Sequence, residues 1–354
     1  MDLQSITPAH AVQLIAFDNS VRGVDVRSED EFKKGAIPKF INIPILNNSE
    51  RREVGVCYKN RGQQAAIELG HKLVDDHRDR LVEQWGNYLQ ETEWPLLTCW
   101  RGGLRSETAA KWIQSAGQKV IRIEGGTKAL RNEFLKELSA PPPFYVIAGP
   151  TGSGKTQLLD QFERCHVDLE KFACHRGSSF GALLRTPQPS QTTFENEIAI
   201  RFVQLRDRAR VLVEDESVAI GSLRVPQAVV NEIKSSAIIR LNVNIEDRVT
   251  NILGDYVKIP LETGIDSRSL EAHYETCLFR IRTRLGGQMH ALALESLKTA
   301  FKKSNFDLHR QWIRLLLENY YDKAYQYAES RLKRPIAFEG DWDQCRNWIQ
   351  NQFA

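Results

Sequence analysis

Long hydrophobic runs are missing from this sequence. No apolar stretch in its 354 residues approaches the roughly 18 consecutive apolar residues of a membrane-spanning helix. The N-terminal segment has neither the basic start nor the long apolar centre of a signal peptide. The six cysteines include no CxxC pair, which fits neither a disulfide framework nor a zinc site. We therefore expect a cytoplasmic protein with free thiols and no membrane partner.

A large excess of one charge is also missing. The chain has 48 Lys and Arg against 45 Asp and Glu, and this balance does not by itself indicate nucleic-acid binding. Residues 271–334 differ from the rest, because they hold 12 basic and 7 acidic side chains. A solvated helical face is the simpler interpretation of this excess, and an RNA-binding surface is the alternative.

The composition is that of an ordinary globular protein, with 42% hydrophobic and 26% charged residues. A chain of this length has room for two domains. Three consecutive prolines, Pro141 to Pro143, cannot continue a helix and mark a short, stiff linker. We predict a first domain in residues 1–140, the core of a second in 144–266, and a helical C-terminal region of that second half in 267–354.

Short apolar runs alternate with helical patterns in both halves, which predicts two α/β domains with largely parallel sheets. Strands are expected at 22–26, 40–43, 96–99, 120–123, 144–148, 211–214 and 237–243. Helices are expected at 63–82 and 104–116, and almost everywhere from residue 267 onward. The positions expected to be buried in the C-terminal helices are Ile281, Leu285, Leu292, Leu297, Trp312, Leu315, Leu316 and Tyr320.

The first candidate site is Cys99, at the end of an expected strand. Arg101, Gly102, Gly103 and Arg105 follow it before a helix begins. The loop amides, the helix N-terminus and the two arginines would all stabilise a thiolate and an anion beside it. An inert, buried strand cysteine is the alternative. We interpret Cys99 as a nucleophile, with Arg101 and Arg105 in the same catalytic group.

This half of the chain resembles the rhodanese family. The resemblance rests on Val24-Asp25-Val26-Arg27-Ser28, Glu31-Phe32, Gly35-Ala36-Ile37-Pro38 and Ile41-Asn42-Ile43-Pro44. It implies a rhodanese-like domain in residues 1–140 that carries sulfur or selenium on the loop cysteine. The seven residues from Cys99 to Arg105 make a longer loop than sulfur-carrying rhodaneses have, as in the related phosphatases. A loop of that width suits a phosphate-sized anion.

The second candidate site is a P-loop that begins after the expected strand 144–148 and opens a helix. Its glycines let the backbone wrap around phosphate oxygens, while a lysine adds a positive charge and a threonine can hold Mg²⁺. The motif predicts a second half that is a P-loop NTPase-like α/β domain. Its predicted diphosphate-binding residues are Gly149, Gly152, Ser153, Gly154, Lys155 and Thr156.

Two further groups are candidates for roles near the P-loop. The apolar strand 211–214 ends in carboxylates, so Asp215 or Glu216 could serve as an acid or hold Mg²⁺ together with Thr156. An exposed acidic strand end is the alternative. A glycine and hydroxyl cluster supplies possible substrate-binding residues, which are His175, Arg176, Ser178 and Ser179. A plain polar loop is the alternative.

The combination of the two domains resembles the bacterial tRNA 2-selenouridine synthase family nearly from end to end. Beyond the two loops, the matching motifs are Val54-Gly55, Tyr58-Lys59, Gly62-Gln63, His175 to Gly181, Gln188-Pro189-Ser190-Gln191, Phe194-Glu195, Glu214-Asp215-Glu216-Ser217, Ile220-Gly221-Ser222, Arg284-Leu285-Gly286, Tyr320-Tyr321-Asp322 and Tyr325.

This resemblance implies a transferase that acts on the wobble uridine of a tRNA anticodon, already carrying sulfur at C2 and a methylaminomethyl-type group at C5. Geranyl diphosphate alkylates the sulfur, and selenophosphate then replaces the geranylthio group with selenium. The substrates imply no permanently bound cofactor, an optional Mg²⁺, and an enzyme that supplies selenophosphate as a further partner. Whether Cys99 carries selenium covalently or positions selenophosphate stays open.

Two other classes of function remain as alternatives. One is a P-loop kinase or ATPase fused to a rhodanese-like sulfurtransferase or phosphatase, which would turn over ATP without tRNA. The other is a binding module that senses ligands without chemistry, although such a module needs no activated thiol.

Overall fold

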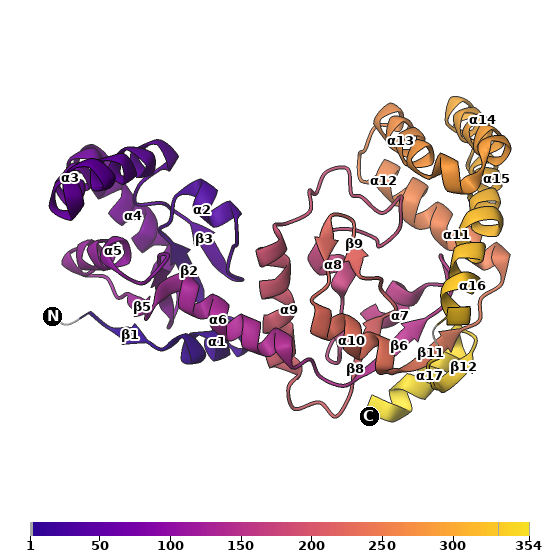
Figure 1. Cartoon of the computed structure of the whole chain (residues 1–354), viewed down its shortest axis with the longest axis horizontal. Coiled ribbons are helices and arrows are strands. Elements are labelled where there is room, and N and C mark those ends of the chain that lie inside the picture. Colours follow the sequence, from indigo (N-terminus) through magenta and orange to yellow (C-terminus); the bar gives the residue numbers. More distant parts are fainter. Residues whose placement is uncertain (1–2, 332, 354) are drawn as a thin grey trace. The chain divides into compact units, whose positions relative to one another are not determined.

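The computed structural model describes residues 3–331 and 333–353, which form two compact units (Figure 1). The first unit comprises the chain up to Ala140 together with Ser190–Arg206. The second comprises Pro141–Pro189 and the chain from Asp207 onward. The polypeptide therefore leaves the first unit at the proline linker, returns to it for one helix, and leaves it again.

The first unit is built on a five-stranded parallel sheet in the order β1-β5-β4-β2-β3. The central strand β4 is buried at every position, as expected for a parallel strand covered on both faces. The strands are β1 (Ser5–Ile6), β2 (Arg22–Asp25), β3 (Phe40–Asn42), β4 (Pro95–Thr98) and β5 (Ile121–Ile123).

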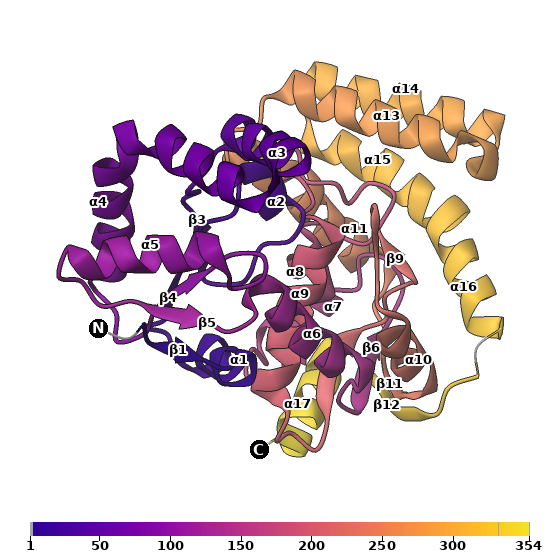
Figure 2. The ribbon, with the colours of Figure 1, turned by 60° about the vertical axis from the view of Figure 1, so that its left-hand side comes forward.

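Helices cover both faces of this sheet, with α3, α4 and α5 on one side and α1 and α6 on the other (Figures 1 and 2). Local signals fix several helix starts: Thr7 caps α1 ahead of Pro8, and Asn47 forms a capping box with Glu50 at α3. The helices are α1 (Pro8–Phe17), α2 (Glu29–Lys33), α3 (Asn48–Val74), α4 (Arg78–Leu89), α5 (Leu104–Ser115), α6 (Gly126–Ser139) and α9 (Gln191–Leu205), with a 3₁₀ turn η1 (Asp75–His77).

Helix α9 belongs to the first unit although it lies beyond the P-loop in the sequence. It packs against α1 and α6. Its Asn196 donates to the carbonyl of Ala36 at 2.7 Å and accepts from Arg131 at 2.9 Å, while Thr193 Oγ1 accepts from the Ala36 amide at 2.9 Å. The motif Phe194-Glu195 is therefore part of the first unit's packing.

The second unit is also built on a five-stranded parallel sheet, in the order β12-β11-β6-β8-β7. A short antiparallel hairpin stands apart from it. The sheet strands are β6 (Phe144–Ala148), β7 (His166–Val167), β8 (Val211–Glu214), β11 (Ala237–Leu241) and β12 (Ile336–Gly340), and the hairpin strands are β9 (Ala219–Ile220) and β10 (Leu223–Arg224).

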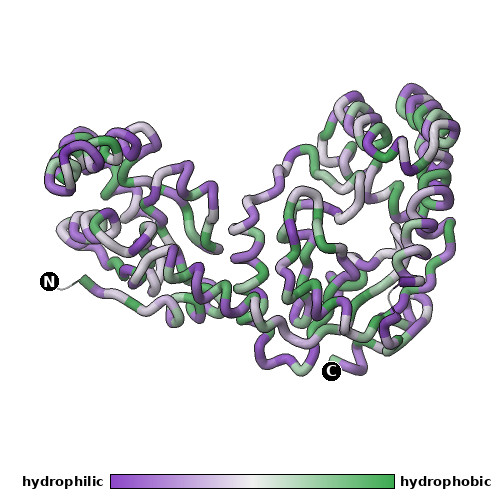
Figure 3. The backbone as a smooth tube through the Cα atoms, in the orientation of Figure 1, coloured by the Kyte–Doolittle hydropathy of each residue, from purple (hydrophilic) through white to green (hydrophobic). Residues whose placement is uncertain are grey.

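Helices surround this sheet, and α13, α14 and α15 form a separate helical layer (Figure 2), in which α14 contacts both of the others. Hydrophobic and hydrophilic residues are interspersed along α13, α14 and α15 (Figure 3), and each of these three helices buries one face. The helices are α7 (Lys155–Asp160), α8 (Leu169–Ala173), α10 (Gln227–Ser235), α11 (Ile245–Leu253), α12 (Ile259–Glu262), α13 (Ser267–Leu285), α14 (Gly287–Lys303), α15 (Phe306–Leu316), α16 (Asp322–Arg331) and α17 (Trp342–Phe353), with π-helical turns η2 (Gly254–Lys258) and η3 (Leu317–Tyr321). None of the helices described is both long and apolar enough to cross a bilayer.

The α/β class is confirmed, and each of the seven expected strands coincides with an observed one to within two residues at either end. The helix expected at 63–82 is wrong in its bounds: α3 begins at Asn48 and α4 ends at Leu89. Glycines at 55, 62 and 70 weaken the helical pattern, and Gly62 does break α3 with a φ of 87°. Leu292 is 46% exposed, so its expected burial is also wrong.

Candidate active sites

Cys99 lies directly after β4 and is buried, with 3% of its surface exposed. Its thiol donates to Ser106 Oγ at 3.2 Å, and that hydroxyl donates to the carbonyl of Gly103 at 3.1 Å. The sulfur therefore faces the first turn of α5, where helix amides favour negative charge.

The backbone of the Cys99 loop is held from behind by the start of α6. The amides of Thr127 and Lys128 donate to the carbonyls of Cys99 and Trp100 at 2.8 and 3.0 Å. Arg122 donates to the carbonyl of Gly102. In the described part of the chain, the N–H groups of residues 100–103 donate to no backbone carbonyl, so they remain available to an anion.

The two arginines of the loop differ in their surroundings. Arg105 forms an ion pair with Glu31 at 2.5 Å, and Arg51 also lies 3.7 Å from Glu31. Burial raises the pKa of Glu31, but hydrogen bonding and charge from Arg105 outweigh this and lower it overall. Arg101 is exposed and makes no ion pair among the described residues. Arg101 is therefore the freer cation for binding a substrate.

Motif residues at the end of β2 serve the framework of the first unit. Asp25 and Arg27 are both almost fully buried and form an ion pair at 2.6 Å. Arg27 also donates to the carbonyl of Gly35 at 2.7 Å. These contacts fix the loops after β2, and we assign the pair a structural role.

The P-loop connects β6 to α7 and lines a cavity of about 1120 Å³ in the second unit. Gly152 and Gly154 have φ values of 82° and 78°, a backbone conformation that favours glycine. Lys155 Nζ donates to the carbonyl of Gly149 at 3.1 Å, within the loop itself. Ser153 Oγ is buried without a hydrogen-bond partner among the described residues. The loop thus holds a buried hydroxyl, that of Ser153, that is free to donate.

Helix α11 and the start of α16 support the P-loop from outside. Arg248 donates from Nε to the carbonyl of Thr151 at 2.9 Å and pairs with Asp322 at 2.5 Å. Asn251 donates to the carbonyl of Gly152 at 3.0 Å. The loop conformation therefore depends on residues about 100 positions away in the sequence.

Three glutamates stand beside the P-loop threonine. Thr156 Oγ1 donates to Glu214 Oε1 at 2.5 Å, and the other oxygen of Glu214 is buried without a partner among the described residues. One carboxylate oxygen from each of Glu170, Glu214 and Glu216 lies within 4.8 Å of the others. Burial, followed by repulsion among these carboxylates, raises the pKa of Glu170 to about 10 and that of Glu214 to about 8.

This all-oxygen group fits Mg²⁺, because a hard cation prefers carboxylate and hydroxyl oxygens and the orphaned oxygen of Glu214 lacks a partner. The sequence analysis favoured Asp215 or Glu216 for this role. Glu216 lies in the group, whereas Asp215 points to Arg334, with hydrogen bonds of 2.8 and 2.6 Å. Asp215 follows the last residue of β8 and, with Arg334, lines another part of the same cavity.

The cluster at 175–181 runs along the same cavity. Arg176 and Ser178 line it together with Ser179, whereas His175 is buried outside it, where burial lowers the pKa of its imidazole. Ser178 Oγ lies 3.1 Å from Tyr256 Oη, and the Arg176 guanidinium lies 5.1 Å from the centre of the same ring.

Both π-helical turns contribute tyrosines to this cavity. Turn η2 supplies Tyr256, and turn η3 supplies Tyr320 and Tyr321, whose rings meet edge to face at 5.0 Å. π-helical turns occur often at functional sites, because the wider turn redirects side chains. The cavity is therefore lined by the P-loop and by an aromatic wall.

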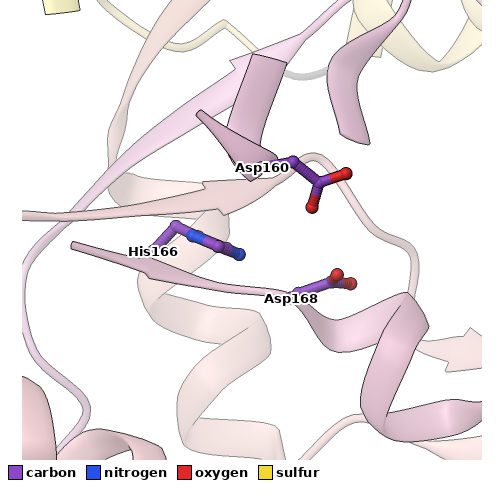
Figure 4. A group of neighbouring side chains, drawn as sticks. All are labelled: Asp160, His166 and Asp168. Carbon is purple, nitrogen blue, oxygen red and sulfur yellow. The ribbon is translucent and has the colours of Figure 1, made fainter. Parts of the chain in front are cut away.

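A further group of ligand-type side chains lies at the end of α7. The side chains of Asp160, His166 and Asp168 converge (Figure 4), and one ligand atom from each lies within 4.8 Å of the others. His166 Nδ1 is 3.0 Å from the carbonyl of Phe162, and Asp168 accepts from the Lys171 amide as the cap of α8. His166 therefore contacts the turn after α7, and Asp168 fixes the start of α8, so both have local structural roles.

Sequence reasoning did not identify Glu170, Glu214 or Tyr256 as site residues, nor Arg248 as a support. Glu170 occurs in a short helix with no motif around it. Glu214 does stand in the resemblance motif Glu214-Asp215-Glu216-Ser217, as Tyr320 and Tyr321 stand in theirs, and these motifs are the available signals.

Comparisons with known proteins agree with this architecture. A model described as the tRNA 2-selenouridine synthase AAA domain matches residues 142–354, and one described as a rhodanese-like domain matches residues 7–133. A tRNA 2-selenouridine synthase from Shewanella sediminis is 35% identical over 365 residues, covering 98% of each chain. Another from Shewanella denitrificans is 38% identical, covering 92% of this chain and 93% of the relative.

Among solved structures, a rhodanese-related protein from Thermoplasma volcanium covers 37% of this chain and 92% of its own, at 20% identity and a TM-score of 0.23. The two family matches and the observed elements define the fold as a rhodanese-like domain joined to a P-loop-type α/β domain with a helical C-terminal region. From the matches along nearly its full length, the chain belongs to the tRNA 2-selenouridine synthase family.

Proposed function

We propose that this protein is a transferase that converts wobble 2-thiouridine in tRNA to 2-selenouridine by geranylation and then selenation. Family membership supports the overall conversion. The observation that carries the two-step scheme is the presence of two anion sites of different chemistry: a cysteine loop with available amides, and a P-loop cavity with an aromatic wall.

In the first transfer, the diphosphate of geranyl diphosphate binds the P-loop at Gly149, Gly152 to Lys155 and Thr156. The C2 sulfur of the uridine attacks the allylic carbon, the carbon–oxygen bond breaks with its electron pair going to pyrophosphate, and N3 loses its proton. Lys155 and the loop amides stabilise the departing charge. The rings of Tyr256, Tyr320 and Tyr321 suit the geranyl chain and the positive charge that develops on it.

A Mg²⁺ ion would be held by Thr156, Glu214 and Glu216, with Glu170 close by. When bound, it supplies charge neutralisation for the diphosphate. The raised pKa values of Glu170 and Glu214 mean that, without a cation, these side chains hold protons at neutral pH and do not repel the diphosphate strongly.

In the second transfer, the amides of residues 100–103 and Arg101 bind the phosphate part of selenophosphate. Selenium attacks C2 of the alkylated base, the C2–S bond breaks, and the sulfur takes the electron pair and a proton to leave as geranylthiol. Water then cleaves the Se–P bond, releasing phosphate and leaving 2-selenouridine with N3 protonated again. Cys99, paired with Ser106, lies at the reacting centre as nucleophile or positioning thiol.

The anticodon and its flanking phosphates are the macromolecular ligand. The exposed basic side chains of α13, including Arg280, Arg282 and Arg284, suit phosphate contacts. An enzyme that makes selenophosphate would supply the second donor, because selenophosphate is a consumed substrate. This assignment needs no ATP hydrolysis.

Mass spectrometry of nucleosides tests the scheme. A 2-thiouridine RNA is incubated with geranyl diphosphate and selenophosphate, using wild type, Cys99→Ala and Lys155→Ala, with Cys57→Ala and Lys171→Ala as matched controls. We expect Cys99→Ala to accumulate the geranylated nucleoside, Lys155→Ala to leave the RNA largely unchanged, and both controls to form 2-selenouridine.

Unchanged RNA with wild-type protein, under conditions in which it hydrolyses ATP, would contradict the proposal and favour the kinase-like alternative. Selenation by Cys99→Ser at the wild-type rate would exclude a covalent selenium intermediate on Cys99 and leave the positioning role.

A further inference from the structure

The first unit contains a groove of about 260 Å³, separate from the P-loop cavity of the second unit. Its walls are one face of α3 and one face of α5, closed by the segment after β3. The groove-lining residues are Ile45, Leu46, Arg51, Val54, Tyr58, Gln63, Ala66, Ile67, Gly70, His71, Val74, Leu104, Arg105, Thr108 and Trp112.

The groove is apolar along most of its length and partly open to solvent. Leu104 and Tyr58 are 50% and 58% exposed, although both side chains are large and hydrophobic. On α5 the groove-lining positions follow helical spacing from Leu104 through Thr108 to Trp112, so they form one continuous stripe. Exposed apolar surface of this kind is typical of a site that a hydrophobic ligand covers.

The groove adjoins the Cys99 loop directly. Leu104 and Arg105 are the last residues of that loop and the first of α5, and Cys99 contacts Ser106 on the same helical turn. Cys99 also packs in the same hydrophobic cluster as Ile45 and Leu46, which line the groove. An apolar group in the groove and an anion on the loop amides would therefore be neighbours.

The charge at the rim of the groove fits that arrangement. Arg51 and Arg105 both approach Glu31, so two guanidinium groups share one carboxylate and the rim keeps an excess of positive charge. A ligand that suits this surface has a hydrophobic chain next to an anionic partner. A purely polar ligand would use only the charged rim.

We propose that this groove binds the geranyl chain of the S-geranylated tRNA intermediate while selenium replaces its sulfur. The inference rests on the proposed function, and it assigns the groove to the second transfer only. With the chain in the groove, C2 of the base lies over the Cys99 loop, and geranylthiol departs along the apolar surface. The groove would thereby select the alkylated base over the unalkylated one.

The test uses the full-length protein and two reactions measured on the same preparations. One is single-turnover selenation, with selenophosphate, of an RNA carrying either 2-(geranylthio)uridine or 2-(methylthio)uridine. The other is geranylation of a 2-thiouridine RNA. Thr108→Trp fills the groove from α5 and Ile67→Gln makes it polar from α3, while Lys111→Trp adds the same ring to an exposed position outside it.

We expect both groove variants to selenate the geranylated RNA at least tenfold more slowly than wild type and Lys111→Trp. Geranylation should stay within twofold of wild type, which also reports correct folding of the rest of the chain. Wild type should prefer the geranylated RNA over the methylated one, and the groove variants should lose that preference.

Equal selenation of the geranylated RNA by wild type and both groove variants would overturn the inference while leaving the two-step scheme intact. The same holds if wild type uses the methylated and geranylated RNAs equally. A wild-type protein that neither geranylates nor selenates would instead refute the proposed function.

Discussion

His309 is a buried side chain of the second unit whose protonation would place a charge in the hydrophobic core. It is 2% exposed, its Nδ1 accepts from Trp312 Nε1 at 3.0 Å, and its ring meets Phe301 edge to face at 4.6 Å. Burial lowers the pKa of His309 to about 4. The neutral imidazole is therefore part of the hydrophobic core, and a proton on it would leave a buried charge.

We predict that the second unit loses stability as pH falls from 6.5 to 4. The unfolded histidine has a pKa of about 6.5, so within this window the unfolded chain binds the proton more readily than the folded one. The loss reaches about 3 kcal/mol at most. Thermal unfolding of His309→Gln should show a shallower fall of Tm with acid, whereas His290→Gln should match wild type. Equal slopes for all three proteins would contradict this.

We predict that Glu214 makes the response of the protein to Mg²⁺ depend on pH. Its pKa of about 8 means that protons compete with the cation near neutrality, since the site must lose them for the cation to bind. We predict that Mg²⁺ raises Tm more at pH 8.5 than at pH 6.5, and that Glu214→Gln abolishes this difference. Glu329→Gln, elsewhere on the cavity wall, serves as the control. A response to Mg²⁺ that Glu214→Gln retains would place the cation elsewhere.

At the scale of elements, the Cys99 loop depends on how closely α6 approaches it. Gly126 has a φ of 63°, and a Cβ there would lie 2.2 Å from the carbonyl oxygen of Cys99. Neither the backbone conformation nor the space allows a side chain. The start of α6 therefore sets the shape of the loop as much as the loop's own glycines do.

Gly126→Ala should consequently distort the loop and lower the selenation rate at least tenfold, at a stability cost of about 1–3 kcal/mol. Geranylation should be unaffected. Gly103→Ala is a matched control in the same loop, because its φ is −93° and an added Cβ meets nothing within 4 Å. Rates from nucleoside mass spectrometry would decide, and a fully active Gly126→Ala would show that the loop tolerates the shift.

At the scale of the whole molecule, the first unit is assembled from two separate parts of the sequence. Helix α9 packs on α1 and α6. Its Thr193 and Asn196 side chains hydrogen-bond to the backbone N–H and C=O of Ala36. A protein cut after residue 140 would expose the apolar helix faces beneath α9 and leave these backbone groups without their partners.

We predict that a fragment of residues 1–140 melts well below the first unit of the intact chain or aggregates. A peptide covering residues 188–207, added in trans, should raise its Tm, whereas the same peptide with Asn196→Leu should not. Circular dichroism melts measure this. A fragment that melts as high alone as with the peptide would show that α9 adds no stability.

The basic surface of α13 leads to a prediction about tRNA. If Arg280, Arg282 and Arg284 bind phosphates, replacing all three with alanine should reduce the slope of log Kd against log salt by up to about 1 for each phosphate that is no longer neutralised. Removal of Lys111 and Lys136, which already pair with glutamates, should leave the slope unchanged. Filter binding over a range of salt concentrations measures both, and identical slopes would move the tRNA site elsewhere.

The parts of this fold that sequence reasoning captured are those with local signals. Strand β6 with its P-loop, and β4 with Cys99, each combine an apolar run with glycines that follow at once. Helix α9 has an equally clear cap at Ser190, but an amphipathic pattern does not say which surface it covers. Its return to the first unit could not be predicted for that reason.

Among the candidate site residues, too, those in a local motif could be predicted and those outside one could not. Lys155 and Thr156 occur in a motif whose spacing carries their chemistry. Glu170 and Tyr256 reach the cavity from a five-residue helix and a π-helical turn, which have no sequence pattern of their own. The groove beside Cys99 is lined by residues of both α3 and α5, so no single segment encodes it.

The split of the first unit also has a consequence for its synthesis on the ribosome. Its sheet and flanking helices are complete at Ala140, but α9 emerges only after residues 141–189 have been made. At 5–20 residues per second, synthesis of the chain through the end of α9 takes roughly 3–13 s longer. Until then the apolar faces of α1 and α6 that α9 covers are exposed. During that interval the nascent chain carries a nearly finished domain with an open apolar surface. A chaperone that binds nascent chains would find its best target in this protein there.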